Sequence, residues 1–269
     1  MSYAEEPLFA LEQVGYRYPG GAVGVQEIDL VLRPGERVVL LGANGCGKST
    51  LLRLLGGLLF PQDGTLAAFG DPLSEEFLSD ASVNAAFRSR VGLVFQNAES
   101  QLFSSSVWEE IAFGPLHLGL PEQEVRQRVE EMLDLFELVK IGERPPFRLS
   151  GGEKRKVALA SVLAVNPSVL LLDEPSTGLD PRSQRWLIDM LARLGAAGKT
   201  LVTATHDLEI VEEIADRVVV FDEDHRLVAS GAPAQILADR DLLLRVNLID
   251  PRFHRHVHGG DHHHYHSHG

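Results

Sequence analysis

Short apolar runs separated by turn residues fill the first part of the chain. Residues 8–41 alternate apolar and polar positions between Pro-Gly turns, a pattern that predicts short β-strands. The run 38–41 is wholly apolar, as is typical of a buried parallel strand. A glycine-rich loop follows this run directly. Beyond the loop the pattern predicts a helix, a hairpin and a further strand, at residues 48–59, 62–70 and 91–95.

The spacing changes over residues 107–140, where apolar residues recur every three or four positions among Glu and Arg. This predicts a helical subdomain, at about 97–148, inserted into a larger domain that spans 1–250. Helices and strands alternate after it, with helices expected at 152–163 and 181–194 and strands at 169–172, 200–205 and 218–221. The alternation predicts an α/β fold with a mostly parallel sheet covered by helices.

Composition narrows the class of protein. The 269 residues are 44% hydrophobic, enough for a sizeable core, and carry a formal net charge of −13. This negative charge argues against a protein that binds nucleic acid through a basic surface. The longest apolar stretch, 157–172, is broken by Asn166 and Pro167 and is shorter than the roughly 18–20 residues of a membrane-spanning helix. We therefore expect no membrane span in this chain.

Histidine is concentrated at the end of the chain. Eight of the eleven histidines lie in the last sixteen residues. Residues 251–269 have little apolar content, and we expect them to form a disordered tail. The eight are His254, His256, His258, His262, His263, His264, His266 and His268.

The glycine-rich loop, residues 42–49, reads G-x-x-x-x-G-K-S and lies after a strand and before a helix. In that context, backbone N–H groups surround phosphate oxygens at a helix N-terminus, where the helix dipole favours negative charge. Lys48 is expected to reach the β- and γ-phosphates, and the Ser49 hydroxyl to bind Mg²⁺. A chance lysine in a glycine-rich turn is the alternative reading.

Two carboxylates end the predicted strand at 169–172. Asp173 is expected to join the magnesium shell, and Glu174 to act as the general base for an attacking water. Taken alone, Asp-Glu after a strand is an ordinary helix start, so the phosphate loop is what favours catalysis.

Between these two motifs, Leu149-Ser-Gly-Gly-Glu153 resembles the signature of the ABC-type ATPases. Gln96 resembles their Q-loop glutamine and His206 their switch histidine, and residues 176–180 resemble their D-loop. Tyr18 matches the aromatic residue that stacks on adenine, although Tyr16 lies nearby. The resemblance spans residues 18–206. It implies a phosphate-loop ATPase with a RecA-like parallel core, an antiparallel β subdomain and an inserted helical subdomain.

The resemblance also assigns roles to residues. It implies catalysis by Glu174, His206 and Gln96, and Mg²⁺ binding by Ser49, Gln96 and Asp173. It further implies that two copies close head to tail around two ATP molecules, with Ser150 of each copy at the other's γ-phosphate. The residues expected to bind nucleotide are Tyr18, Gly42, Asn44, Gly45, Cys46, Gly47, Lys48, Ser49, Thr50, Ser150, Gly151, Gly152 and Asp173.

Within this family, residues 94–115 and 149–160 are similar to the energy-coupling factor ATPases. That likeness implies integral membrane partners, a position at the cytoplasmic face of the membrane, and no nucleic acid partner. Small departures are Glu153, where glutamine is common, and Ala43 and Cys46, where proline and serine are common. None of them removes an expected phosphate ligand.

The histidine tail bears on the substrate. Imidazole donors without thiolate suit Ni²⁺, Co²⁺, Zn²⁺ or Cu²⁺. A histidine tail on such an ATPase resembles the cobalt/nickel type, so we expect ATP and Mg²⁺ as ligands and Ni²⁺ or Co²⁺ on the tail. Three alternatives stay open: a vitamin-uptake ATPase with an incidental tail, a cloning tag, and a metal-storage or chaperone NTPase. The last would lack the signature and the Q-loop.

Overall fold

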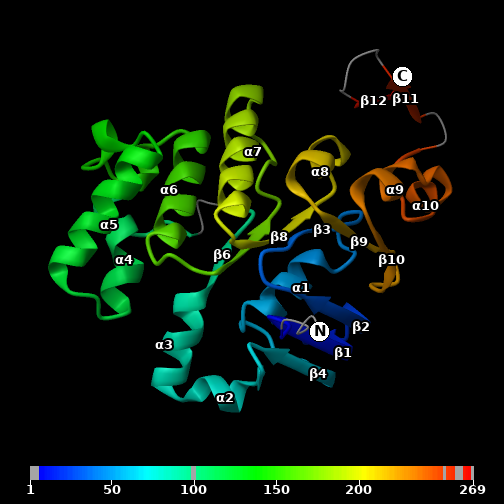
Figure 1. Cartoon of the computed structure of the whole chain (residues 1–269), viewed down its shortest axis with the longest axis horizontal. Coiled ribbons are helices and arrows are strands. Elements are labelled where there is room, and N and C mark those ends of the chain that lie inside the picture. The colour runs from blue at the N-terminus through cyan, green and yellow to red at the C-terminus, as the bar shows by residue number, and fades with distance from the viewer. Residues whose placement is uncertain (1–5, 98–100, 251–252, 258–262, 268–269) are drawn as a thin grey trace, which may run out of the picture. The chain divides into compact units, whose positions relative to one another are not determined.

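A computed structural model describes residues 6–97, 101–250, 253–257 and 263–267 (Figure 1). The chain forms two compact units. Unit 1 comprises residues 1–75 and 190–269, and unit 2 comprises residues 76–189. The two boundaries fall within or beside helices α2 (Glu75–Ser79) and α7 (Pro181–Ala196).

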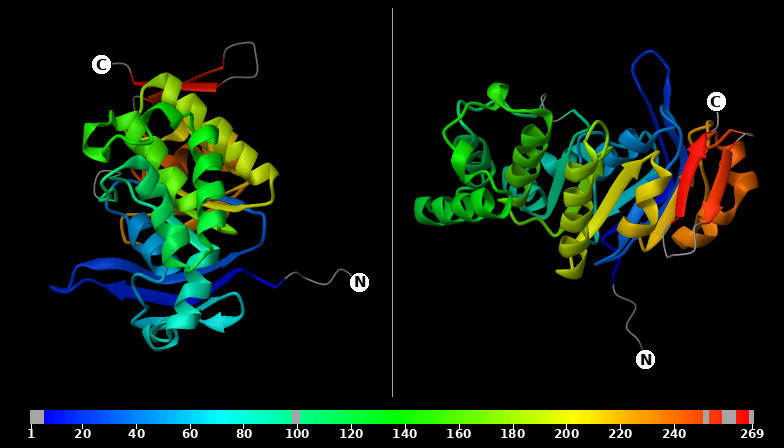
Figure 2. Two further views of the ribbon diagram at one scale, coloured as in Figure 1. Left: turned by 90° about the vertical axis from the view of Figure 1, so that its left-hand side faces the viewer. Right: turned by 90° about the horizontal axis from the view of Figure 1, so that it is seen from above.

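Unit 1 contains an antiparallel sheet built from the strands that the early alternating pattern predicts. Its order is β2-β1-β4-β5, and its long strands β1 and β2 are drawn in blue in Figure 2. Apolar residues on one face, such as Phe9, Leu11 and Ile28, are buried. The bounds are β1 (Phe9–Arg17), β2 (Val23–Leu32), β4 (Asp63–Ala68) and β5 (Asp71–Pro72).

The second sheet of unit 1 carries the glycine-rich loop. Strand β3 (Arg37–Leu41) pairs in parallel with β8 (Thr200–Thr205) and β9 (Arg217–Phe221), and β9 pairs antiparallel with β10 (Leu227–Gly231). Helix α1 (Lys48–Leu55) contacts both β8 and β2, so it packs between the two sheets. The unit also contains the helices α8 (Leu208–Ile214), α9 (Pro233–Ala238) and α10 (Arg240–Arg245).

Unit 2 holds the parallel pair β6 (Val91–Val94) and β7 (Val169–Asp173) together with most of the helices. The described part of the predicted helical region contains α4, α5 and the short 3-10 helices η2 and η3. The bounds are α3 (Ala81–Arg90), α4 (Val107–His117), α5 (Glu122–Leu135), η2 (Val139–Ile141), η3 (Pro146–Arg148) and α6 (Gly151–Leu163).

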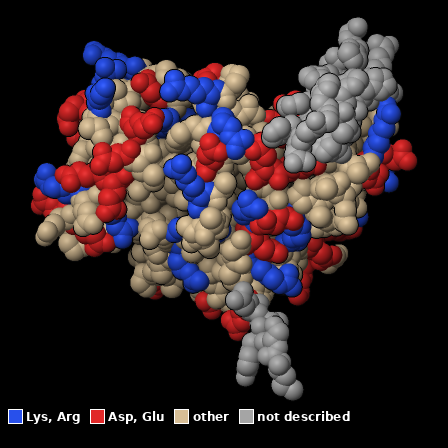
Figure 3. Space-filling view, turned by 45° about the horizontal axis from the view of Figure 1, so that its top comes forward, with Lys and Arg blue, Asp and Glu red and all other residues tan. Residues whose placement is uncertain are grey.

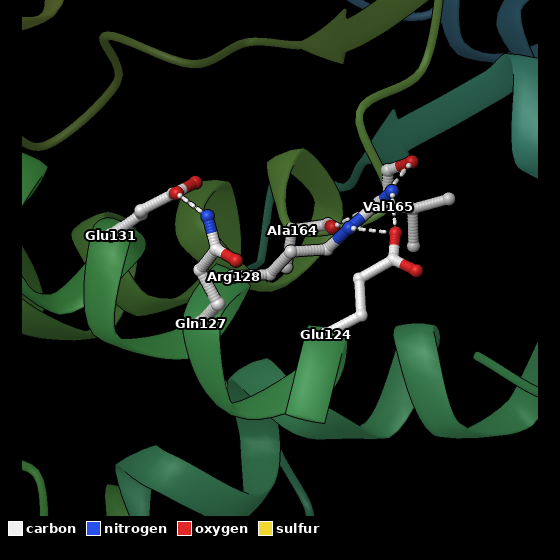
Figure 4. A network of polar contacts seen from close by, with 6 residues as sticks. All are labelled: Glu124, Gln127, Arg128, Glu131, Ala164 and Val165. Atoms are coloured by element: carbon white, nitrogen blue, oxygen red, sulfur yellow. Dashed lines mark hydrogen bonds and ion pairs between the residues drawn. The ribbon is translucent and has the colours of Figure 1, made fainter. Parts of the chain in front are cut away.

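Arg128 fixes α5 against the end of α6 (Figure 4). Its Nη1 donates to the carbonyl oxygens of Ala164 and Val165, at 3.0 and 3.1 Å. Glu124, one turn earlier on α5, accepts from Nε and Nη2 of the same guanidinium at 3.1 and 2.7 Å. Two unsatisfied carbonyls at the C-terminus of α6 thereby gain a charged donor. Helix α6, which carries the signature, is held at its far end.

Two short strands are assigned within the histidine tail. Strands β11 (Phe253–Val257) and β12 (His263–Ser267) pair antiparallel and lie side by side in Figure 2. The expectation that the tail is disordered stays a prediction. His258, His262 and His268 lie outside the described residues.

None of the helices in the described part of the chain is both long and apolar enough to cross a membrane. On the face that Figure 3 shows, the described basic and acidic side chains are interspersed rather than gathered into separate patches.

Candidate active site

The phosphate loop joins β3 to α1 in unit 1, as the sequence predicts. Gly45 and Gly47 adopt positive φ angles of 86° and 113°. A Cβ on Gly47 would lie 2.4 Å from the carbonyl oxygen of Gly24, so only glycine fits there. These left-handed positions turn successive N–H groups into a concave surface that suits an anion.

Lys48 is held inside this loop. Its side chain is 5% exposed, and its Nζ donates to the carbonyl oxygens of Gly42 and Ala43 at 2.7 and 3.0 Å. An ammonium group so placed at a helix N-terminus suits the phosphates of a nucleotide. The first turn of α1 also carries Ser49, which is half buried, and Thr50, which is buried. Asn44 is exposed on the loop.

Cys46 is a packing residue of the loop. It is 3% exposed, and a Cβ on Gly42 would lie 2.6 Å from its Sγ. Burial raises the pKa of the Cys46 thiol, and the nearby Lys48 charge offsets this only in part. The thiol is therefore neutral at physiological pH and fills space without supplying charge.

Tyr18 is tied to helix α1. Its hydroxyl lies 3.0 Å from Oγ1 of Thr50 and accepts a hydrogen bond of 3.1 Å from Nη1 of Arg53. Tyr16 packs edge-on against it, with ring centroids 5.1 Å apart. A Cβ on Gly24 would lie 2.7 Å from the Thr50 methyl and 3.2 Å from each tyrosine ring. The aromatic pair is thus fixed relative to the phosphate loop.

His206 also belongs to unit 1. The parallel register pairs Leu41 with Thr205, so the first residue of the phosphate loop and His206 follow at the same edge of the sheet. The imidazole is exposed. Asp207, the next residue, caps α8 by accepting from the backbone N–H of Glu209 at 3.0 Å.

The two predicted catalytic carboxylates end β7 in unit 2. Asp173 is 6% exposed and Glu174 is 4% exposed. Glu174 has a φ of +46°, which is rare for a residue with a side chain and costs on the order of 1–3 kcal/mol. The Thr177 hydroxyl donates to Oε2 of Glu174 at 3.3 Å. Such strained, oriented carboxylates are typical of functional sites.

Ser150 caps α6, as the signature motif predicts. Its Oγ accepts from the backbone N–H of Glu153 at 3.3 Å, while its own N–H and hydroxyl both donate to Oε2 of Glu153 at 2.8 Å. These bonds hold the pKa of Glu153 below its usual value, so the carboxylate is ionised at neutral pH. Gly151 and Gly152 form the first turn, and a Cβ built on Gly151 would meet no atom within 4 Å beyond its chain neighbours and the backbone of its own helix. Gln96, also in unit 2, is exposed just after β6.

Three contributing residues escape sequence reasoning. Arg53 and Thr177, described above, bond Tyr18 and Glu174. Arg155 of α6 is 7% exposed and donates from Nη2 to the carbonyl oxygen of Thr177 at 3.2 Å, while its buried Nη1 has no partner among the described residues. Burial lowers the pKa of Arg155. Arg53 lies one turn after Thr50 on α1, but the sequence does not indicate its contact with Tyr18, which is 35 positions away.

A pocket of about 670 Å³ lies within unit 2. Phe103, Phe113 and Val162 contribute apolar surface to it, and Arg88 and Glu110 contribute charge. Phe103 and Phe113 stay 67% and 47% exposed, although their rings pack edge to face at 4.8 Å. Phenylalanine rings this open to solvent are a feature of surfaces that bind a partner.

Among the side chains that the structure describes, which exclude those of the tail strands, no three His, Cys, Asp or Glu residues gather closely enough to hold a metal ion. The phosphate loop, by contrast, fits a nucleotide phosphate through its left-handed glycines and its buried lysine. Loop, buried lysine and strand-end carboxylates together define a phosphate-loop nucleotide-binding protein.

Comparisons with known proteins refine this class. The model of the ABC transporter family matches residues 25–177. The nickel import ATP-binding protein NikO of Rhodobacter capsulatus is 49% identical over 246 residues, which are 90% of this chain and 96% of NikO. The cobalt import ATP-binding protein CbiO of the same organism is 44% identical over 247 residues, 91% of this chain and 86% of CbiO.

A solved structure agrees with these relatives. The dimeric ATP-binding cassette MJ0796, bound to ADP and Pi in a post-hydrolysis state, superposes with a TM-score of 0.75 at 27% identity. The match covers 84% of this chain and 98% of that one. The chain belongs to the ABC transporter family as an ATP-binding subunit, and it is an ATPase.

Proposed function

We propose that two copies of this chain hydrolyse ATP to energise uptake of nickel or cobalt through a separate membrane component. The relatives named nickel and cobalt import proteins, at 49% and 44% identity over nine-tenths of the chain, carry the proposal. The eight histidines of the tail favour a transition metal over a vitamin as cargo. The chain would then act at the cytoplasmic face of the membrane.

In unit 1, Lys48 and the loop N–H groups would neutralise the phosphates of ATP, and Tyr18 would stack on the adenine. We propose that Ser49, with Gln96 and Asp173 of unit 2, binds the Mg²⁺ of the substrate complex. Bound Mg²⁺ would neutralise charge that develops on the transferred phosphoryl group. Gly45 and Gly47 supply the backbone turn on which this cradle depends.

For hydrolysis, Glu174 would accept a proton from the attacking water. Its place directly after Asp173 at the end of β7 favours this role, because it lies beside the carboxylate that we expect to bind Mg²⁺. The bond from Thr177 holds the Glu174 side chain in position. His206, at the edge of the unit 1 sheet, would contact the same γ-phosphate.

The signature helix would complete the partner's site. Ser150 and the N–H groups of the first turn of α6 form an anion-binding end, because thirteen residues of helix add their dipole there. The dimeric form of the related cassette supports an assembly of two copies. We expect the specific ATPase activity to rise with protein concentration as dimers form. A specific activity that stays constant on dilution to the monomer would overturn the head-to-tail arrangement.

The pocket of unit 2 gives the membrane component a place to bind. It lies beside α4 of the predicted helical subdomain, and its lining also includes residues of α3, of β6 and of the end of α6. Its exposed phenylalanines suit an apolar segment of the partner. Movement of this subdomain would then pass from the nucleotide to the membrane component.

Glu174→Gln tests the enzymatic part of the proposal. The amide keeps the shape of the side chain but cannot accept the proton, so turnover should fall at least about 100-fold while ATP binding stays within about threefold. Glu130→Gln makes the same chemical change at an exposed position of α5 and should leave both unchanged. Continued hydrolysis by Glu174→Gln would contradict the role of general base.

Transport tests the cargo. Cells that express the complete transporter should accumulate radiolabelled nickel or cobalt, and Glu174→Gln should abolish the accumulation. Uptake of a B vitamin instead of either metal, dependent on Glu174, would refute the metal assignment and favour the vitamin alternative.

A further inference from the structure

The pairing between β1 and β4 stops short of the end of β1. Its register pairs Gly15 with Asp63 at the last paired position of β1. Continued two residues further, the same register would place Pro61 opposite Arg17. Proline has no N–H to donate, so it cannot complete the ladder there. Arg17 directly precedes Tyr18, so the backbone that leads into the aromatic pair needs another partner on this side.

The side chain of Gln62 supplies that partner. Its Oε1 accepts from the backbone N–H of Arg17 at 2.9 Å, and its Nε2 donates to the carbonyl oxygen of Arg17 at 3.0 Å. The backbone N–H of Gln62 also donates to the carbonyl oxygen of Gly15 at 2.9 Å. An amide that bonds both backbone groups of one residue holds that residue in one orientation, as a neighbouring antiparallel strand would.

After Arg17 the chain enters the turn that carries Tyr18. The N–H of Tyr18 donates to the carbonyl oxygen of Ala22 at 2.8 Å, and the N–H of Gly21 donates to the carbonyl oxygen of Tyr18 at 3.0 Å. Gly21 has a positive φ of 89°, which suits a tight turn. These two bonds fix the shape of the turn but not its position, because both lie within it. The position depends on how the turn is attached to the rest of unit 1.

Tyr18 is attached through both its backbone and its side chain. The hydroxyl is bonded by Thr50 and Arg53 of α1, and the backbone is held through the contact of Gln62 with Arg17. We propose that Gln62 is a positioning residue for the nucleotide, which acts by holding Tyr18 in the orientation in which its ring stacks on adenine. The inference rests on the proposed function for the stacking role of Tyr18.

Stacking depends on the orientation of the ring. Two flat rings gain most when they lie parallel and in contact, so a rotated or mobile Tyr18 ring would hold the base less well. A ring that is already held in place loses less freedom when the nucleotide binds. Gln62 should therefore change the affinity for adenine nucleotides and leave the chemistry at the γ-phosphate unchanged, because its bonds lead to Tyr18 and not to Lys48.

The experiment is calorimetric titration of the full chain with MgADP, which carries the base and is not hydrolysed. Gln62→Met nearly keeps the length of the side chain and removes both bonds to Arg17. Because Gln62 is exposed, the core of the protein is left intact. ADP binding should weaken about threefold to tenfold. Gln123→Met makes the same change at an exposed position of α5 and should leave the affinity within about 1.5-fold. Wild-type affinity of Gln62→Met would overturn the inference.

A double-mutant cycle with Tyr18→Ala separates positioning of the ring from a general effect on the fold. Once the ring is removed, Gln62→Met should weaken ADP binding by less than about 1.5-fold. An equal loss with and without the ring would refute the inference, because Gln62 would then support the site by another route. Inorganic pyrophosphate, which has no base, should bind equally well to Gln62→Met and to the wild type, and weaker binding would also contradict the inference.

Steady-state hydrolysis provides an independent measurement. For Gln62→Met, the KM for ATP should rise by about the same factor as the dissociation constant for ADP, at a constant kcat. A fall in kcat at constant KM would contradict a role in positioning the base.

The cycle also distinguishes this inference from the proposed function. If Tyr18→Ala weakens ADP binding and Gln62→Met does not, the stacking role of Tyr18 stands and the inference about Gln62 fails. If Tyr18→Ala leaves ADP binding unchanged, the stacking role itself fails, and the inference fails with it.

Discussion

Glu153 places a negative charge at the end of α6 that is expected to meet a phosphate. Its Oε2 lies 2.8 Å from both the nitrogen and the hydroxyl oxygen of Ser150. The Ser150 hydroxyl has one proton, and Glu153 receives it, so a phosphate oxygen would have to compete for the same hydrogen bond. Glu153→Gln removes the charge and keeps the capping box, which accepts either residue at this position.

The magnitude follows from the geometry. A phosphate oxygen bonded to the same hydroxyl at about 2.8 Å would lie roughly 4.6 Å from the Glu153 carboxylate oxygen. Two unit charges at that distance repel by about 0.9 kcal/mol in water, and screening at 0.15 M salt leaves about half. With two charges on the γ-phosphate, repulsion is about 1 kcal/mol at each of the two ATP molecules of the dimer, or about 30-fold in the association constant. Glu153→Gln should relieve this repulsion.

The assay is sedimentation of the Glu174→Gln protein with ATP, because blocked hydrolysis allows the dimer to accumulate. Adding Glu153→Gln should strengthen ATP-dependent dimerisation about tenfold to 50-fold, because both contacts of the dimer change, and the gain should shrink in 1 M salt, where the Debye length is about 3 Å. Glu130→Gln in the same background is the control and should have no effect. The unfolding free energy should change by less than about 0.5 kcal/mol. Unchanged or weaker dimerisation at equal stability would refute the reasoning.

Two further substitutions test contacts in unit 1. Tyr18→Phe removes the hydroxyl that forms hydrogen bonds with Thr50 and Arg53. The KM for ATP should therefore rise about threefold at constant kcat. An unchanged KM would show that the hydroxyl does not position the ring. Hydrogen bonds from Arg37 lower the pKa of Asp216 in the folded protein. The pair therefore stabilises the fold fully above the unfolded-state pKa of about 3.9. This stabilisation is lost as the pH falls through the lower folded-state pKa. In urea unfolding, Asp216→Asn should therefore lower the free energy of unfolding by at most about 1 kcal/mol at pH 7 and by less at pH 3. An equal decrease at both pH values would contradict a stabilisation that depends on the charge of Asp216.

Local sequence was enough to predict the parts of the site that are contiguous in the chain. The phosphate loop, the strand ending in Asp173 and the helix beginning after Ser150 all depend on residues within a few positions of one another, and the structure confirms these elements. Contacts between distant positions left no such signal. Arg155 and Thr177 are 22 positions apart, and Tyr18 and Arg53 are 35 apart, so only the fold brings each pair together.

Arg155 connects two groups that the proposed dimer would use at different nucleotides. Ser150 opens α6 and would contact the partner's ATP, whereas Glu174 would act on the ATP of its own copy. Arg155, one turn after the cap of the same helix, holds the Thr177 carbonyl, and the Thr177 hydroxyl bonds Glu174. Leaving Nη1 of this buried guanidinium without a partner costs on the order of 1–3 kcal/mol. An apolar residue would avoid that cost but could not bond the loop, so a shift of α6 would no longer act on the loop that holds Glu174.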